Sequence, residues 1–267
     1  MRAHFDLYLT QVKTALASMF QYRISNLLWL VAMVVEPVVY LVVWSSVARQ
    51  QGGSVAGYTP GAFAAYYITW TLVRQMNIAL TPYAFESRVR KGELSPMLLR
   101  PMHPFHFDLA WFMGFKIVTF VLWLPIALVL TLAFRPTLDP TWWQVAAFLF
   151  VLVTGFVMRF VLLWVLGLVT FWVTRVSAVF ELYFTVELLL SGRLVPLDLL
   201  PPWARSLADW LPFQWTFGYP IEVLLGRLSV AQTLWGMLMQ AVWFAIGAAM
   251  IALLWRPAVR KYSAVGA

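Results

Sequence analysis

Long runs of apolar residues dominate the chain and predict helices that cross a membrane. A spanning helix needs about 20 mostly apolar residues, because the hydrocarbon core is about 30 Å thick and a helix rises about 1.5 Å per residue. Five stretches meet this requirement, with at most one charged residue each: 27–48, 60–82, 109–134, 142–174 and 228–255. The fourth is longer than one crossing requires, so we expect it to project beyond the bilayer or to break before Arg175.

A sixth span is expected at 176–196, although its first part is short and carries Glu181 and Glu187. The segment 192–227 that follows is rich in Leu and Trp but contains five prolines. Proline removes a backbone donor and breaks helices, so this segment predicts short helices that dip into the membrane from the outer side. The residues that mark this outer re-entrant region are Gly192, Pro196, Pro201, Pro212 and Phe213.

An amphipathic helix is predicted ahead of the first span, over 1–25. Apolar residues recur there at spacings of three and four, at Phe5, Leu9, Val12, Leu16 and Met19. Such a stripe is typical of a helix that lies on the membrane surface. An early Asp6 and the lack of a small-residue cleavage site disfavour a signal peptide.

Composition and charge support an all-α membrane protein with six transmembrane helices. Hydrophobic residues make up 62% of the 267 positions and charged residues 11%, against about a quarter charged in soluble domains. The net charge of +8 does not predict nucleic-acid binding, because membrane proteins gather Lys and Arg in cytoplasmic loops. With the N-terminus inside, eleven Lys and Arg fall on the inner side and five, Arg193 among them, on the outer side. We therefore expect both termini in the cytoplasm.

Motifs for catalysis or cofactor binding are missing. The chain has no Cys, which excludes disulfides and thiolate metal sites. It has no GxxxxGK phosphate loop, HExxH, GxSxG or dinucleotide fingerprint. His4, His103 and His106 lie near expected membrane boundaries and lack further metal ligands. We expect no catalytic residue, no metal and no cofactor bound by this chain.

The loop 83–106, between the second and third spans, begins with charged residues and ends with leucines at roughly helical spacing. Its candidate residues are Glu86, Arg88, Arg90, Gly92, Glu93, Leu94 and Leu98. The pattern predicts a short surface helix with one polar and one apolar face, with breaks at Gly92 and Pro96. An ordinary positively charged cytoplasmic loop is the alternative.

Five ionisable residues fall within the expected spans: Glu36, Arg74, Lys116, Arg159 and Glu187. A charge at the bilayer centre costs about 2.5–3.5 kcal/mol on insertion scales, so each residue should face protein or water and find a partner. The favoured interpretation is structural ion pairing between spans. The alternative places Glu36 or Glu187 on a cavity wall that meets cationic cargo.

Three features resemble the permeases of type-two ABC exporters, notably the viologen-exporter-like subfamily. The first is Gly92, Glu93 and Leu94 followed by Leu98, Leu99, Arg100 and Pro101. The second is the stretch 191–196 with the downstream Leu211, Pro212 and Phe213, and the third is a surface helix ahead of six spans.

This resemblance implies a coupling helix within 83–99 that docks in a groove of a separate ATPase. Glu86, Arg88, Arg90 and Glu93 would face the ATPase, and Leu94 and Leu98 would anchor the helix. It also implies two ATPase copies that bind ATP and Mg, a second permease subunit, identical or related, and a bacterial inner membrane whose lipids surround the chain. The expected function is export of an amphipathic or lipid-like small molecule, and no nucleic acid is expected as a partner.

Other functions are compatible with the same pattern. A related permease could export a polysaccharide or a lipid-linked glycan. An ion-coupled secondary carrier would use Glu36 and Glu187 as titrating groups, although no internal repeat is evident. An intramembrane enzyme acting on lipids would need clustered polar residues that the sequence does not offer, and a structural membrane subunit is the remaining class.

Overall fold

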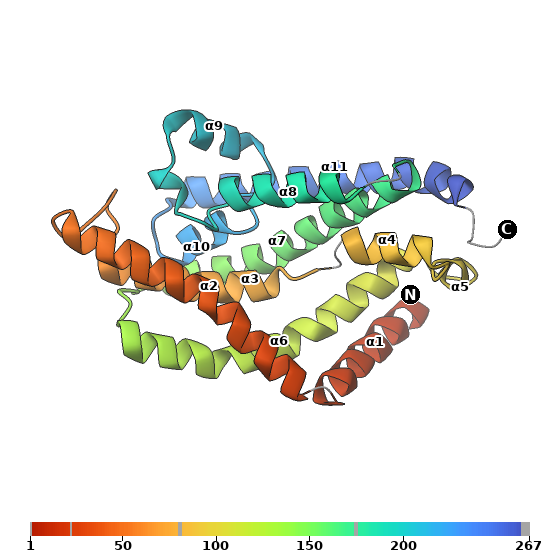
Figure 1. The fold of residues 1–267 in the computed structure, drawn as a ribbon, viewed down its shortest axis with the longest axis horizontal. Helices are drawn as coiled ribbons and strands as arrows, with labels where there is room; N and C mark the ends of the chain where they lie inside the picture. The colour runs from red at the N-terminus through yellow and green to blue at the C-terminus, as the bar shows by residue number, and fades with distance from the viewer. Residues whose placement is uncertain (1, 22, 80–81, 174–175, 263–267) are drawn as a thin grey trace.

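The computed structural model describes residues 2–21, 23–79, 82–173 and 176–262, and within these residues it contains helices and no β-strand. Figure 1 shows an elongated bundle in which α7 and α11 run along the long axis. The α-helices are α1 (Arg2–Gln21), α2 (Arg23–Gln50), α3 (Pro60–Met76), α4 (Pro82–Arg90), α5 (Ser95–Leu98), α6 (Pro104–Phe134), α7 (Trp142–Leu168), α8 (Ser177–Leu190), α9 (Pro202–Trp210), α10 (Gly218–Leu224) and α11 (Val230–Lys261). Two short 3-10 helices are η1 (Val169–Phe171) and η2 (Leu197–Leu199).

Three of the described helices are long and apolar enough to cross a membrane. They are α6, α7 with its η1 extension to Phe171, and α11, which contain 31, 30 and 32 residues. At about 1.5 Å per residue each exceeds the roughly 30 Å hydrocarbon core. The chain is therefore an all-α membrane protein, and the expectation that the apolar stretches form helices is confirmed.

The remaining expected spans have different bounds in the structure. α3 has 17 residues and ends at Met76, and residues 80 and 81 of the expected span lie outside the described residues. α8 has 14 residues, about 21 Å of helix, so it is shorter than the expected span 176–196. α2 begins at Arg23 and contains Pro37. The count of six spans stays a prediction, and Arg175, where a break was expected, lies outside the described residues.

Several helices begin at residues that satisfy free backbone amides. The Thr59 side chain accepts a hydrogen bond from the amide of Ala62, with Pro60 in the first turn. Ser229 and Gln232 form a capping box at the start of α11. Such caps stabilise a helix by about 0.5–2 kcal/mol, which explains why these helices start where they do.

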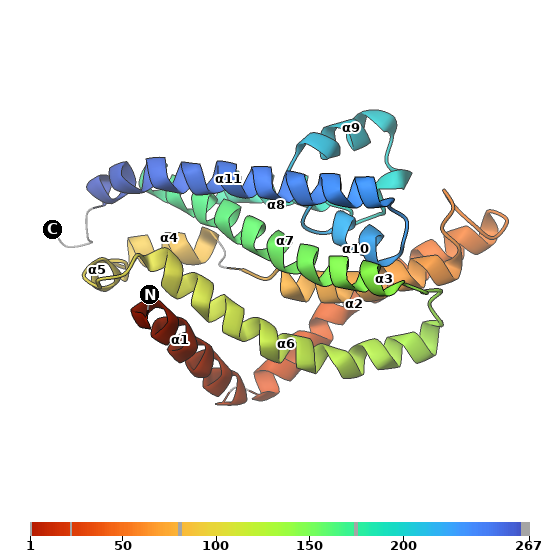
Figure 2. The same ribbon diagram turned by 180° about the vertical axis from the view of Figure 1, so that it is seen from behind.

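The two ends of the bundle carry different segments, as the views in Figures 1 and 2 agree. We call the first the α4 end: it contains α4, α5, the start of α6 and the last turns of α11, and α1 begins there. The second, which we call the α10 end, contains α9, α10 and the turn at 51–59. The first and the last helix thus both reach the α4 end.

α7 is the central helix of the bundle and packs against α3, α4, α10 and α11, while α1 packs along α6. Its buried residues Val151 and Met158 share a core with Tyr67 and Trp70 of α3. α11 approaches α7 closely at Gly247, where an added Cβ would lie 2.6 Å from Cγ1 of Val161. Close packing at small residues is how membrane helices associate, since lipid tails are as apolar as the side chains.

Candidate functional site

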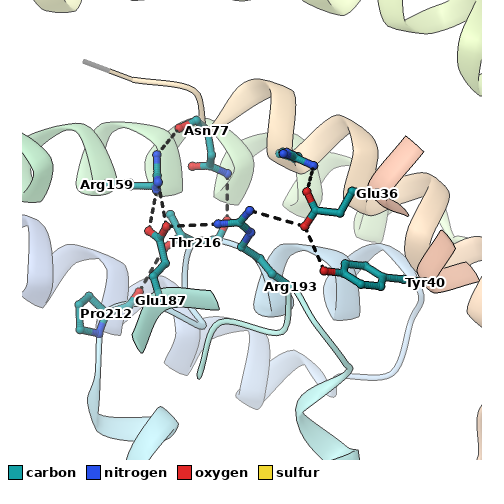
Figure 3. Close-up of polar contacts among 9 residues, drawn as sticks. Glu36, Tyr40, Asn77, Arg159, Glu187, Arg193, Pro212 and Thr216 are labelled. Carbon is teal, nitrogen blue, oxygen red and sulfur yellow. Dashed lines mark hydrogen bonds and ion pairs between the residues drawn. The ribbon is translucent and has the colours of Figure 1, made fainter. Parts of the chain in front are cut away.

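A buried ion pair joins α7 to α8. Nε and Nη2 of Arg159 donate to the two carboxylate oxygens of Glu187 at 2.8 and 2.9 Å, a bidentate arrangement that matches the shapes of both groups. Figure 3 shows the pair at one side of a larger set of polar contacts. Because an unpaired charge inside a membrane protein is costly, this contact fixes how α8 packs on α7.

Arg193 extends the pair into a chain of charges that reaches α2 and α3. Its guanidinium nitrogens lie 3.6 Å from Oε2 of Glu187 and 4.0 Å from Oε1 of Glu36. Glu36 also accepts from Nη1 of Arg74 at 2.5 Å and from the hydroxyl of Tyr40 at 3.2 Å. The count of charges by side places Arg193 among the outer charges, whereas its side chain turns inward between the two carboxylates. Its position directly after Gly192 was the one available signal for such a turn.

Backbone groups and one aromatic ring complete this charge network, which consists of Glu36, Arg74, Arg159, Glu187 and Arg193. Nη1 of Arg159 donates to the carbonyl of Asn77 at 2.7 Å, and the Asn77 side chain donates to the carbonyl of Thr216 at 3.0 Å. The Phe217 ring centroid lies 5.4 Å from Cζ of Arg159 and 5.3 Å from Cζ of Arg193, within cation–π range. The network therefore also binds the end of α3 to the turn before α10.

Lys116 lies outside the charge network, in a second polar contact at the end of α3. Its Nζ donates to the carbonyl of Gln75 at 3.3 Å and to the carbonyl of Ile78. It also lies 4.5 Å from the Phe156 ring centroid. Carbonyls in the last turn of a helix and just beyond it lack regular helical partners, and the ammonium group binds one on each side of the end of α3.

The geometry of the network permits binding and positioning, and offers no catalytic arrangement. The described residues contain no group of three or more His, Cys, Asp and Glu that could hold a metal. The Glu187 side chain is 1% exposed, whereas that of Glu36 is 31% exposed. Glu36 is therefore the carboxylate of this network that a molecule outside the bundle can reach.

The α4–α5 unit (82–99, with Leu99 as the C-cap of α5) is a separate candidate site at the α4 end. Phe85 is buried against Trp164 of α7, with ring centroids 5.2 Å apart. Nη1 of Arg88 donates to Asp108 of α6 at 2.7 Å, and Asp108 also accepts from the Trp164 indole at 3.2 Å. These contacts attach the unit firmly to the long helices α6 and α7.

The outward-facing residues of this unit differ in part from those that the resemblance implied. Arg88 is directed at Asp108, and Leu94 is 1% exposed and packs inside the chain. Both residues therefore hold the unit in place. The side chains that face outward include Arg90, which is 74% exposed, Glu93, and Leu99, which is 88% exposed. Glu86 lies 3.5 Å from Arg90, and Gly92 forms the turn with φ +74°.

A family model for ABC-2 family transporter proteins matches residues 30–266. The chain belongs to the ABC-2 transporter family. It is therefore a permease subunit of an ABC transporter and acts in membrane transport. Among curated proteins, no sequence matches this chain.

The region 192–227 of this ABC-2 permease contains short helices, as its prolines predict. Gly192 has φ +83° and ends the turn after α8. Pro196 precedes η2, and Pro201 precedes α9. Pro212 is buried, and Phe213 packs in a small cluster with the apolar side of α9. The entry of these helices into the bilayer stays a prediction.

An ion cluster at the α10 end of the ABC-2 chain surrounds Glu222. The hydroxyl of Tyr58 donates to Oε1 of Glu222, and Nε of Arg227 lies 3.1 Å from Oε2. Arg227 and Arg205 both approach Asp198, at 3.5 and 2.9 Å. Burial raises the pKa of the Glu222 carboxyl to about 7, against the opposing effects of Tyr58 and Arg227. α10 lies outside the three long apolar helices.

We expect the stability of the ABC-2 chain to fall with rising pH because of Glu222. Its pKa of about 7 exceeds the ordinary value of 4.5, so the folded protein holds this proton more tightly than the unfolded chain. This contribution to the free energy of unfolding is complete below the ordinary pKa. It is lost as pH rises through the pKa of the folded state, a loss of roughly 2–3 kcal/mol. Thermal unfolding in detergent from about pH 5 to about pH 8 measures it. In Glu222→Gln the part of the pH dependence of stability that comes from Glu222 should vanish. The same change in stability with pH in both proteins would refute the assignment.

Proposed function

We propose that this chain is the membrane-spanning half of an ATP-driven exporter of the viologen-exporter-like subfamily. Two such permease subunits, identical or related, would engage two copies of an ATPase that binds ATP and Mg. The chain would cross a bacterial inner membrane six times, with both termini in the cytoplasm. Family membership and the missing phosphate loop support this assignment, because ATP must then be bound by another chain.

The observation that carries the proposal is the α4–α5 unit. A coupling element must transmit force, so it needs rigid attachment on one side and a free surface on the other. Phe85, Leu94 and the Arg88–Asp108 pair supply the attachment. Leu99 and Arg90 supply an exposed apolar and an exposed charged group, a combination suited to an apolar anchor with charges that set its orientation. Closure of the ATPase dimer would push this unit against α6 and α7.

The interior of the bundle supports an amphipathic or lipid-like cargo. Its buried surface is dominated by aromatic and aliphatic side chains, which offer few hydrogen bonds to a highly hydroxylated sugar. Glu36 is the partly exposed carboxylate of the charge network. It would contact a polar or cationic portion of the cargo.

Affinity purification of the detergent-solubilised chain, followed by an ATPase assay, tests the proposal. We expect an ATPase subunit to co-purify and to show vanadate-sensitive turnover. The double variant Leu99→Asp with Arg90→Glu should lose ATPase co-purification and turnover by at least about tenfold, because removing an anchor and a complementary charge at an interface costs about 2 kcal/mol or more. The variant chain should remain inserted and retain its melting temperature, since both side chains are exposed.

Arg49→Glu provides the matched control, because Arg49 is an exposed arginine at the far end of α2. It should keep both the partner and the turnover. Repeated recovery of the chain alone, stable and without ATPase activity, would contradict the exporter assignment. Normal turnover in the double variant would contradict only the role of the α4–α5 unit.

A further inference from the structure

A cavity of about 650 Å³ lies at the α10 end, between α9, α10 and the start of α11. This volume is within the range of about 300–1,000 Å³ that is typical of small-molecule sites. Its walls combine charged and aromatic side chains, which include Arg205, Asp209, Trp210, Arg227 and Trp235. Trp210 is 74% exposed and Trp235 54% exposed, so the two indoles stand where the cavity opens to the surroundings.

α9 lies along one side of this cavity. The helix has three distinct faces. Ala204 and Ala208 are buried against the bundle. Trp203, Leu207 and Trp210 are exposed and form one apolar stripe at spacings of four and three. Exposed tryptophans on an amphipathic helix are typical of the membrane interface. Arg205 and Asp209, one turn apart, line the cavity, so the charged side of α9 faces the cavity.

The cavity holds charged side chains of both signs. Within the described part of the chain, no cationic side chain lies within 4.0 Å of Asp209, which accepts a hydrogen bond from the Gln214 amide at 3.0 Å. Arg205 pairs with Asp198, which Arg227 also approaches, and Arg227 pairs with Glu222 at 3.1 Å. The Arg205 side chain is 55% exposed, so its guanidinium stays open to a further acceptor. Charged groups of both signs in one cavity complement a zwitterion.

The exposed face of α11 continues from the cavity as an apolar surface. Trp235 lies at its mouth. Its neighbour Leu234 is exposed, and so are Leu238 and Val242 on the following turns. Hydrocarbon chains that leave the cavity would find this surface directly beside it. A soluble zwitterion without hydrocarbon chains would not contact this apolar surface.

We propose that this cavity binds the headgroup of a zwitterionic phospholipid. The ammonium group lies at Asp209, the phosphate at Arg205 and Arg227, and the acyl chains along α11. Charge-assisted contacts to phosphate and to ammonium are shorter and stronger than hydrogen bonds between neutral groups. Lipid binding in this cavity does not depend on ATP-driven transport. Evidence against one of the two proposals would therefore not contradict the other.

Native mass spectrometry of the purified, delipidated full chain tests this binding. The probes are dioleoyl phosphatidylethanolamine, which has an ammonium group, and dioleoyl phosphatidylglycerol, which has the same chains and phosphate but no ammonium group. We expect the chain to bind the ethanolamine lipid about tenfold more tightly, since one hydrogen bond to a charged group is worth about 1.5–3 kcal/mol. Asp209→Asn should abolish this preference. Arg205→Gln should lower the affinity for both lipids by about tenfold.

Asp139→Asn is the control, because Asp139 is an exposed acid between α6 and α7 at the same end of the bundle. It should leave both affinities unchanged. Equal affinity for the two lipids in the native chain, or an unchanged preference in Asp209→Asn, would overturn the proposal. Competition by free phosphorylethanolamine at concentrations similar to those of the lipid would assign the cavity to a soluble zwitterion and overturn the lipid assignment.

Discussion

Replacing Glu187 with Gln is expected to destabilise the bundle more than any other single loss of charge in the chain. The change leaves Arg159, buried in α7, without its bidentate partner and leaves Arg193 with Glu36 alone. Removing one partner of a buried ion pair costs about 3–5 kcal/mol, which for a chain of this size corresponds to a fall in melting temperature of roughly 6–20 °C. Thermal unfolding of the detergent-solubilised protein measures it.

Two further variants separate the loss of the pair from a general sensitivity of α8. Glu181→Gln changes an exposed acid on the same helix and should alter stability by about 0.5 kcal/mol or less. The double variant Arg159→Met with Glu187→Met removes both charges, and it should be more stable than Glu187→Gln because a buried pair can be replaced by apolar residues at little cost. If Glu187→Gln melts like the native chain, the pair does not hold α8 to α7.

Replacing Gly192 with Ala should produce the second large effect. Gly192 has φ +83°, and an added Cβ would lie 2.8 Å from the Tyr66 hydroxyl oxygen and 2.9 Å from Cα of Gly218. The left-handed backbone costs an alanine about 1–2 kcal/mol, and the crowding adds about 1–3 kcal/mol because the backbone of Gly218 cannot move aside easily. The melting temperature should fall by roughly 4–20 °C. Arg193 should also lose its place between Glu36 and Glu187.

Gly53→Ala isolates the backbone part of this effect. Gly53 has φ +102°, and an added Cβ would meet no atom within 4 Å. We expect this variant to lose only about 1–2 kcal/mol. Equal losses for Gly192→Ala and Gly53→Ala would mean that the close approach of Gly192 to Gly218 contributes nothing to stability.

Local features of the sequence were sufficient to predict the helical membrane class and much of the segmentation. The apolar stretch that begins at residue 142 became α7, since nothing in its sequence favours any other state in lipid. The prolines of 192–227 divided that region into η2, α9 and α10, because proline cannot continue a helix. The length of α8 was less predictable. The expected span reached Pro196 through Leu194 and Val195, but the turn at Gly192 ends the helix early.

The sequence also identified most of the charges that matter, but it could not assign their partners. Glu187 lies 28 positions from Arg159 and Glu36 lies 38 positions from Arg74, so neither pair has a local pattern. Arg88 was expected to face a partner protein, and no pattern in the sequence indicates its acidic partner Asp108. Their contact depends on how α4 lies against α6, which a single-helix pattern does not encode.

The sequence by itself therefore determined what kind of protein this is: a helical membrane protein, without a phosphate loop in this chain, and with a charged surface element before α6. These properties follow from composition and short-range pattern, which act within one helix or one turn. The tertiary structure alone decided that Arg193 turns inward, that Leu94 anchors within the chain, and that Arg205 and Asp209 border one cavity. Those outcomes depend on the rotation and position of whole helices, and only the packing of the complete bundle sets them.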